Sequence, residues 1–257
     1  MDTLMVIALI LGRKGSRGFP GKNTLPILGH PLAWYPMKTA QTVEEIDKIY
    51  LSTDDPDLIQ IAENLGIEII ERPEHLANHE ALGEHAYVHG YEEIKKRNRN
   101  QSIELLVLLF CNAATITTKA IREGITVLRD RPSFDSAVTV SRYNMWSPLR
   151  ARKLDDRGRL QPFIPFEIFG DPRTLNCDRD SQGDVWYADM GCSVVRPHCL
   201  ENLAEGLLPQ KWMGKKIAPI YQEAGCDIDY EWQVPLVEWW IKTYWDIDNK
   251  NLNGDSD

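Results

Sequence analysis

A continuous apolar run at Met5–Leu11 constrains the fold of this chain more than any other segment. The run is directly followed by a loop at 12–23, GRKGSRGFPGKN. Apolar runs without alternation are typical of strands buried on both faces, as in parallel sheets that helices cover on both sides. This run is too short to span a membrane, and Asp2 before it does not match the basic start of a signal peptide. The sequence therefore predicts a buried strand that opens an α/β fold.

Strand-like and helical segments alternate after this run. Strands are expected at 46–52, 67–70, 104–110 and 136–140. Helices are expected at 32–43, 57–65, 82–96 and 117–128, where Gly66 is suited to end a helix and Thr117 to begin one. The strand at 104–110 is the most apolar and is expected near the centre of the sheet. This order predicts a mostly parallel, Rossmann-like sheet with helices on both faces.

Residues 142–186 interrupt the alternation, because they are rich in Arg, Asp, Pro and Gly and show little periodicity. We expect short antiparallel strands and loops there, inserted on the sheet. Regular structure returns as a strand at 189–196, a helix near 198–206 and a last helix at 231–244. The polar residues 246–257 are expected to be disordered. We therefore predict a single domain at 1–245 that contains the inserted antiparallel subregion.

The composition limits the partners that the chain can bind. A net charge of −9 and a pI near 5.2 disfavour nucleic acid and anionic membrane surfaces as partners. An anionic ligand must therefore be met by local positive charge. The five cysteines form no Cys-x-x-Cys pair, and we expect free thiols in a reducing cytoplasm.

The loop at 12–23 supplies such local charge. Glycines stand at positions 12, 15, 18 and 21, and the cations are Arg13, Lys14, Arg17 and Lys22. In open α/β sheets, ligands bind at the carboxyl ends of the strands, and a glycine-rich basic loop there suits a polyphosphate. The spacing matches neither a Walker A loop nor the dinucleotide fingerprint. The alternative is a solvated basic turn.

Fixed polar positions in and after the loop form a longer motif. They are Arg13, Ser16, Arg17, Pro20, Lys22, Asn23, Gly29, Pro31 and Leu32. This pattern resembles the N-terminus of the CMP-sialic acid synthetases, the acylneuraminate cytidylyltransferases. Looser matches follow at 52–54, 71–77, 135–138 and 227–229. The resemblance implies a nucleotidyltransferase fold of the GT-A-like type and a homodimer built through 142–186.

The resemblance also implies a reaction, in which CMP passes from CTP to an acidic acceptor and pyrophosphate is released. Arg13 and Lys22 would hold the triphosphate as the catalytic cations. The nucleotide-binding residues would be Gly15, Ser16, Asn23 and Arg72, and Asn112 would face the acceptor. Asp227 and Asp229 would bind Mg²⁺.

The chemistry of these two aspartates agrees with that assignment. Carboxylate oxygens suit a hard divalent cation, and in an extended segment side chains two positions apart share a face. The alternative is that Asp227 and Asp229 cap the helix that follows, where acidic residues are favoured.

The chain departs from the family where an acceptor would be recognised. The family's Gln-Pro-Thr-Ser-Pro-Leu-Arg loop is replaced by FCNAATI at 110–116, so that Asn112 stands at the position of the first Thr. Further departures lie at 78–79 and 188–192. We therefore expect an atypical acidic acceptor: another nonulosonic acid, another α-keto sugar acid or a phosphonate. The candidate cations for its acid group are Arg142, Arg150 and Arg152.

Two other functions remain open at this point. A GT-A glycosyltransferase could use Asp227 and Asp229 as its metal motif, and an inactive nucleotide-binding sensor would explain the altered loop at 110–116. Three tryptophans of the last helix, Trp232, Trp239 and Trp240, are expected in the core or at a dimer contact rather than at a ligand.

Overall fold

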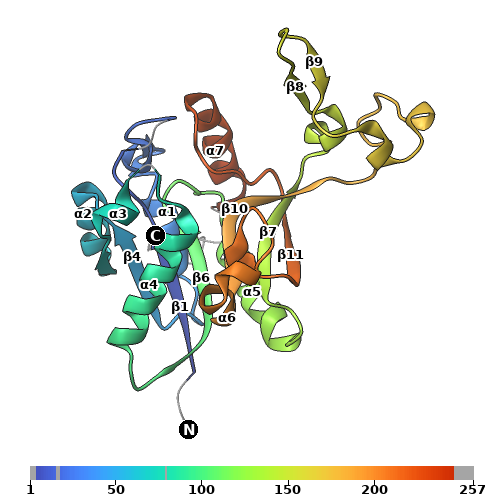
Figure 1. Ribbon diagram of the computed structural model, residues 1–257. Coiled ribbons are helices and arrows are strands. Elements are labelled where there is room, and N and C mark those ends of the chain that lie inside the picture. The colour runs from blue at the N-terminus through green and yellow to red at the C-terminus, as the bar shows by residue number, and fades with distance from the viewer. Residues whose placement is uncertain (1–3, 16–17, 79, 246–257) are drawn as a thin grey trace, which may run out of the picture.

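A seven-stranded sheet forms the centre of the protein in the computed structural model, which describes residues 4–15, 18–78 and 80–245 (Figure 1). In sequence order its strands are β1 (Leu4–Leu11), β4 (Lys48–Thr53), β5 (Glu68–Glu71), β6 (Ser102–Phe110), β7 (Ser136–Arg142), β10 (Trp186–Val195) and β11 (Ile217–Gln222). Their spatial order is β11-β7-β10-β6-β1-β4-β5. All neighbouring strands are parallel except β10, which runs antiparallel to β6 and β7. The predicted mostly parallel sheet is confirmed, with β6 at its centre.

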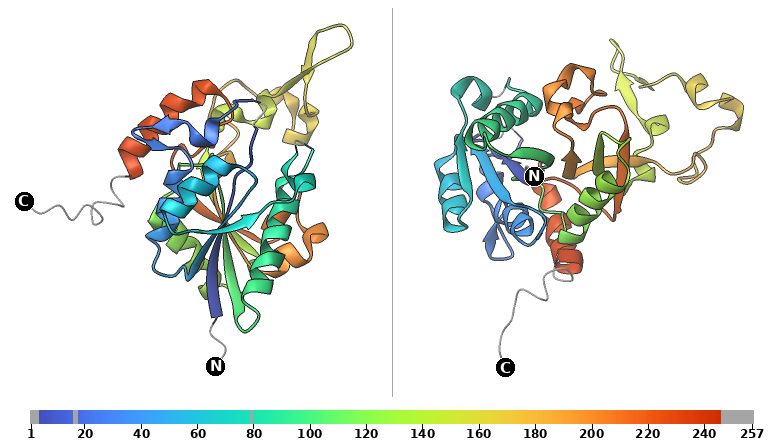
Figure 2. Two further views of the ribbon diagram at one scale, coloured as in Figure 1. Left: turned by 90° about the vertical axis from the view of Figure 1, so that its left-hand side faces the viewer. Right: turned by 90° about the horizontal axis from the view of Figure 1, so that it is seen from below.

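Helices cover both faces of this sheet (Figure 2). The helices are α1 (Trp34–Gln41), α2 (Pro56–Asn64), α3 (Glu74–Ala77), α4 (Gly83–Arg97), α5 (Thr118–Asp130), α6 (His198–Glu201) and α7 (Val234–Trp240). Alternate residues of β1 pack against the helices on opposite faces of the sheet. Val6, Ala8 and Ile10 pack with α1, α2 and α5, whereas Ile7 and Leu9 pack with α4 and α6. The first strand is therefore buried on both faces, as its uninterrupted apolar run predicts.

Local signals in the sequence agree with several helix ends. The hydroxyl of Thr117 accepts a hydrogen bond from the amide of Ala120 (3.1 Å) at the start of α5. Gly66 follows α2 with φ +69°, a conformation that suits glycine. The expected last helix is a continuous helical segment, because a 3₁₀ turn at Glu231–Gln233 and a π-helical turn at Ile241–Trp245 flank α7. No helix among the described residues is long and apolar enough to cross a membrane.

The inserted segment contains a separate antiparallel hairpin, as predicted, formed by β8 (Arg152–Leu154) and β9 (Leu160–Pro162). The expectation that it lies on the sheet is wrong: it projects away from the sheet in Figures 1 and 2. All residues of β8 are exposed, which agrees with a hairpin that does not pack on the sheet.

Two elements differ from the sequence-based expectation. The edge strand β11 was not predicted, because Pro219 interrupts its strand pattern. Proline lacks a backbone N–H donor, and a strand at the edge of a sheet tolerates that loss. The helix expected near 198–206 is only one turn of α6, followed by a 3₁₀ turn at Leu203–Glu205. Asn202 leaves the helical region between them (φ −120°, ψ 45°). A small hairpin of β2 (Pro26–Ile27) and β3 (His30–Pro31) follows the N-terminal loop.

Candidate active site

Most of the predicted site residues line one cavity of about 340 Å³, here called the basic cavity. It lies where β1, β5 and β6 end, which is the side of an open α/β sheet where ligands bind. The predicted residues that line it are Arg13, Lys22, Asn23, Arg72, Asn112 and Asp229. Gly15 belongs to the same loop, with φ +74°, but does not line the cavity. Ser16 and the neighbouring Arg17 lie outside the described residues.

Lys22 is the most buried charged side chain among the described residues of the N-terminal loop, at 8% exposure. It begins a 3₁₀ turn at Lys22–Thr24, which Gly21 precedes with φ +74°. Its ammonium forms an ion pair with the carboxylate of Asp229. Gly18 makes this approach possible, because a Cβ there would stand 2.7 Å from the carbonyl oxygen of Asp229. The loop therefore packs closely against the segment that carries the two predicted metal ligands.

Asn23 and Arg13 are linked through the backbone of the loop. The Asn23 Nδ2 donates to the carbonyl oxygen of Arg13 at 3.4 Å. The Oδ1 of Asn23 is buried and has no hydrogen-bond partner among the described residues. A buried acceptor without a partner is costly, so its position favours a ligand donor. The guanidinium of Arg13 donates to the carbonyl oxygen of Asn78, on the far side of the cavity.

Arg72 places a second buried cation in the cavity, directly after β5. Its Nη2 donates to the carbonyl oxygen of Ser52 at 2.6 Å, and its Nε donates to the Ser52 hydroxyl at 3.3 Å. Burial lowers the pKa of Arg72, while Cys111 and Asp54 act in the opposite direction. A guanidinium nevertheless stays protonated in proteins. The cavity therefore has a fixed positive charge that no carboxylate of the described residues neutralises by contact.

Asn112 connects the end of β6 to the C-terminal aspartates. Its Nδ2 donates to the Oδ2 of Asp227 and to the carbonyl oxygen of Ile228, both at 3.1 Å. The Ile228 amide in turn donates to the carbonyl oxygen of Asn112 at 2.9 Å. Burial raises the pKa of Asp227, the neighbouring charge of Asp229 adds to this, and Lys22 opposes it. The two carboxylates are therefore close enough to repel each other.

The alternative considered for these aspartates, that they cap the following helix, does not match the contacts. The side-chain oxygen of Gln233 accepts from the amides of both Asp229 and Tyr230, each at 2.7 Å, at the start of the last helical segment. The carboxylates instead contact Asn112 and Lys22. The segment at 227–229 is also irregular rather than a strand.

The donor set of Asp227 and Asp229 fits a magnesium ion only in part. The described residues contain no group of three His, Cys, Asp or Glu side chains that could enclose a metal. Mg²⁺ commonly takes one or two carboxylates and completes its shell with substrate phosphates and water. The pair therefore suits a cation that arrives with a phosphate ligand, not a closed structural site.

The altered loop at 110–116 forms a wall rather than a polar surface. Ala113 and Ala114 are fully buried. The Thr115 hydroxyl exchanges hydrogen bonds with the backbone of Cys226 at 2.8 and 2.9 Å. Of this loop, only Phe110 and Asn112 line the basic cavity. Asn112 is therefore the one polar side chain that this loop presents to the basic cavity.

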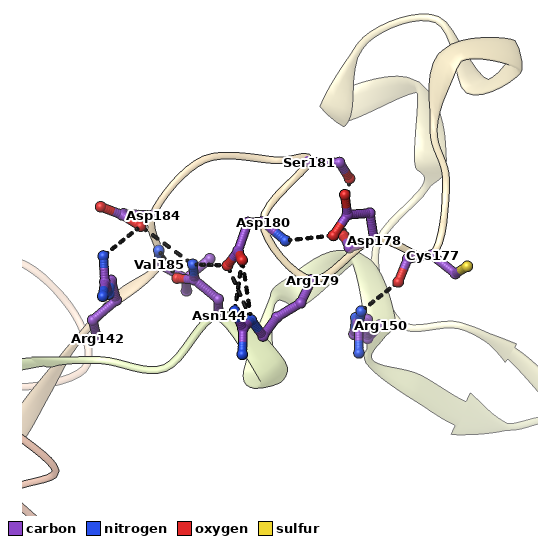
Figure 3. A network of polar contacts seen from close by, with 10 residues as sticks. All are labelled: Arg142, Asn144, Arg150, Cys177, Asp178, Arg179, Asp180, Ser181, Asp184 and Val185. Atoms are coloured by element: carbon purple, nitrogen blue, oxygen red, sulfur yellow. Dashed lines mark hydrogen bonds and ion pairs between the residues drawn. The ribbon is translucent and has the colours of Figure 1, made fainter.

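The three arginines expected to meet an acid group line no part of the basic cavity. Arg142 pairs with Asp184 (3.5 Å) and Arg150 donates to the carbonyl oxygen of Cys177 (2.7 Å), as Figure 3 shows. Arg152 donates to the backbone of Leu149 at 2.8 Å. These contacts fold the inserted segment, so that its polar side chains are mostly used within it.

A second cavity, of about 350 Å³, lies on the other side of Asp227 and was not predicted from the sequence. We call it the aromatic cavity, because Tyr143, Trp146, Tyr187, Trp232 and Trp239 line it. Trp240 lies in the core, as expected. Trp232 and Trp239 are 61% and 50% exposed and therefore do not belong to the core. The aromatic residues come from separate segments, so no spacing could have revealed them. Asp189 also lines this cavity, and one feature of the sequence could have pointed to it, because it is the only acidic residue in the apolar strand β10.

Comparisons with known proteins agree with the resemblance seen in the sequence. Residues 7–100 match the cytidylyltransferase family model. The chain is 30% identical over 159 residues to an N-acylneuraminate cytidylyltransferase of Escherichia coli, covering 62% of this chain and 36% of that protein. It is 22% identical over 230 residues to the N-acylneuraminate cytidylyltransferase of Oncorhynchus mykiss, covering 89% and 49%. The chain thus spans about a third to a half of these relatives.

The fold has close structural counterparts. A solved structure of CMP:2-keto-3-deoxy-manno-octonic acid synthetase, complexed with CTP, superposes with a TM-score of 0.65 at 17% identity. The match covers 93% of this chain and 98% of that one. The predicted nucleotidyltransferase-like fold is confirmed.

Proposed function

Residues 7–100 of this chain match the cytidylyltransferase family model, and we propose on that premise that the chain transfers CMP from CTP to an acceptor oxygen. Pyrophosphate is the leaving group. The observation that carries the proposal is the basic cavity, where the N-terminal loop, Arg72, Asn112 and Asp229 meet at the ends of the strands. The global charge of −9 makes such a local concentration of cations necessary for a triphosphate.

Several cations of the basic cavity bind the triphosphate, each in a different way. Negative charge grows on the departing phosphates, and fixed cations and amides that face it lower the barrier. Arg13 acts as a two-pronged donor and Lys22 as a compact charge. By the resemblance, Gly15 and Ser16 would add hydrogen-bond donors from the loop. Arg72 and the unpartnered Oδ1 of Asn23 hold the rest of the nucleotide.

Magnesium is the proposed cofactor. Asp227 and Asp229 would hold it together with phosphate oxygens, and bound Mg²⁺ would neutralise part of the phosphate charge. Lys22, by pairing with Asp229, holds that carboxylate beside the cavity.

An acidic acceptor is proposed from the relatives, which by name act on N-acylneuraminate. The candidates are a nonulosonic acid, a related α-keto sugar acid or a phosphonate. Asn112 supports an acceptor position at the border of the two cavities, because it lines the basic cavity and contacts Asp227 of the aromatic one.

A homodimer built through 142–186 is also proposed. Exposed apolar side chains gather on this segment, among them Leu154, Leu160, Phe163 and Ile168, and a second copy would cover them. The five free cysteines are compatible with action in the cytoplasm.

The experiment is pyrophosphate release with Mg²⁺, each of the four nucleoside triphosphates and a panel of sugar acids and phosphonates. Release with CTP and one acceptor supports the proposal. Sugar transfer without pyrophosphate would replace it with a glycosyltransferase. CTP that neither raises the melting temperature nor releases pyrophosphate would overturn it.

A further inference from the structure

The aromatic cavity has the composition of a site for a cation. Five aromatic rings line it, contributed by the segment after β7, by the start of β10 and by the last helical segment. Tyr143 and Tyr187 meet at a ring-centroid distance of 6.3 Å and an angle of 67°. Trp146 and Trp232 are 60% and 61% exposed, and the Trp232 ring is stacked with Tyr230 at a centroid distance of 6.4 Å. Aromatic faces attract ammonium groups, and cages of such rings recognise quaternary ammonium ligands.

The charged residues of the cavity point to the same ligand. Asp189 and Asp227 line it, and its described lining contains no Lys, Arg or His. Asp227 is the proposed magnesium ligand, so Asp189 is the carboxylate left to a ligand of this cavity. An acid group would be repelled by Asp189, whereas an ammonium group would meet both the rings and that carboxylate.

Asp189 is held firmly in place for such a role. It is 5% exposed and accepts hydrogen bonds from the Ser141 hydroxyl (2.6 Å), the Gln222 side-chain amide (2.9 Å) and the Gly191 amide (3.2 Å). No cationic side chain of the described residues pairs with it. Burial raises the pKa of Asp189, because a buried carboxylate without a cation is penalised. A bound ammonium group would supply the missing opposite charge.

The position of the cavity relates this ligand to the transfer reaction. Asp227 lines the aromatic cavity, and its carboxylate accepts from Asn112 of the basic cavity at 3.1 Å. The two cavities therefore adjoin at this pair of residues.

We infer that the aromatic cavity binds the ammonium group of the acceptor, and that the acceptor is a small aminoalkyl phosphonate or phosphate. The inference rests on the proposed function for the transfer itself. An anionic oxygen of the phosphonate forms the new bond to the α-phosphorus of CTP. The bond from that phosphorus to the bridging oxygen breaks, and pyrophosphate leaves with the electron pair, so that no proton has to be removed.

The binding test uses choline and its neutral isostere, in which carbon replaces the nitrogen, with tryptophan fluorescence and calorimetry as readouts. We expect choline to bind at least about tenfold more tightly than the isostere. Trp232→Leu should weaken choline binding at least about fivefold. Trp186→Leu is the matched control, because Trp186 is an exposed tryptophan of β10 that lies against Tyr221 and outside the cavity lining. Asp189→Asn should also weaken choline and leave the isostere unchanged.

Each contrary result has a distinct meaning. Equal binding of choline and isostere, or equal losses in the Trp232 and Trp186 variants, would overturn the inference. So would a dimer that dissociates on Trp232→Leu while choline does not bind, because the cavity would then be covered by a second copy.

Turnover separates the inference from the proposed function. We expect pyrophosphate release from CTP with aminoethylphosphonate and at least about tenfold less with ethylphosphonate, which lacks the ammonium group. Release with N-acylneuraminate and not with aminoethylphosphonate would overturn the inference and leave the proposed function in place. If CTP neither raised the melting temperature nor released pyrophosphate with any acceptor, the proposed function would be overturned, whatever the result with choline.

Discussion

Lys22 and Asp229, which lie 207 positions apart in the sequence, form an ion pair at the basic cavity. The lysine side chain is 10% exposed and the aspartate side chain 56%. The buried ammonium thus keeps an opposite charge next to it, and the carboxylate is held facing the cavity. This ion pair therefore joins the N-terminal loop to the segment at 227–229.

Replacing Lys22 tests whether this charge serves catalysis. Lys22→Ala removes a charge-assisted contact to a phosphate, of about 1.5–3 kcal/mol, and should lower the rate of pyrophosphate release at least about tenfold. Lys14→Ala is the control, because Lys14 belongs to the same loop, is exposed and does not line the cavity. Steady-state assays of both variants give the comparison. Equal rates for the Lys22 variant and the wild type would remove Lys22 from the site.

Replacing Asp229 tests the proposed magnesium site. Asp229→Asn keeps the shape of the side chain and removes its charge, and should raise the Mg²⁺ concentration for half-maximal turnover at least about tenfold. Glu231→Gln removes an exposed acid two positions away and should leave the titration unchanged. A metal titration of Asp229→Asn that matches the wild type would show that the carboxylate is no ligand.

The raised pKa of Asp227 predicts a conflict between stability and function. Burial favours the neutral form in the folded protein, so the ionised carboxylate lowers stability above that pKa, and the penalty disappears as the pH falls through it. Asp227→Asn should therefore raise the Tm at neutral pH without metal, and the gain should shrink as the pH is lowered. Each kcal/mol gained corresponds to about 2–4 °C. The same variant should lose metal-dependent turnover. A Tm difference that stays constant with pH would contradict this explanation.

The elements of the fold that depend on local patterns could be predicted from the sequence. The run at Met5–Leu11, the cap at Thr117 and the central strand at 104–110 all lie where their composition indicates. The edge strand β11 escaped prediction because Pro219 masks its pattern and its pairing with β7 is long-range.

The two cavities also differ in how far they could be predicted from the sequence. Arg13, Lys22 and Asn23 lie within one motif, and the ends of parallel strands bring that motif near Arg72 and Asn112. The rings of the aromatic cavity come from segments that no motif joins, so only the fold places them together.

A further prediction concerns the packing beneath the N-terminal loop. A Cβ on Gly12 would stand 2.4 Å from the Leu58 side chain and 2.6 Å from the Cys111 sulfur. Gly12→Ala should therefore destabilise the fold by about 1–3 kcal/mol through overpacking. Combining it with Cys111→Ala should recover part of that loss, with a coupling of about 0.5–3 kcal/mol.

Urea unfolding of the two single variants and the double variant measures this coupling. Gly83→Ala is the control, because Gly83 lines the basic cavity as Gly12 does. A Cβ on Gly83 would meet only the Phe110 ring, at 3.7 Å, which is an ordinary van der Waals contact. It should change the free energy of unfolding by no more than about 1 kcal/mol. Strictly additive effects of Gly12→Ala and Cys111→Ala would mean that the strain is relieved elsewhere, through Leu58, and that residues 12 and 111 are not energetically coupled.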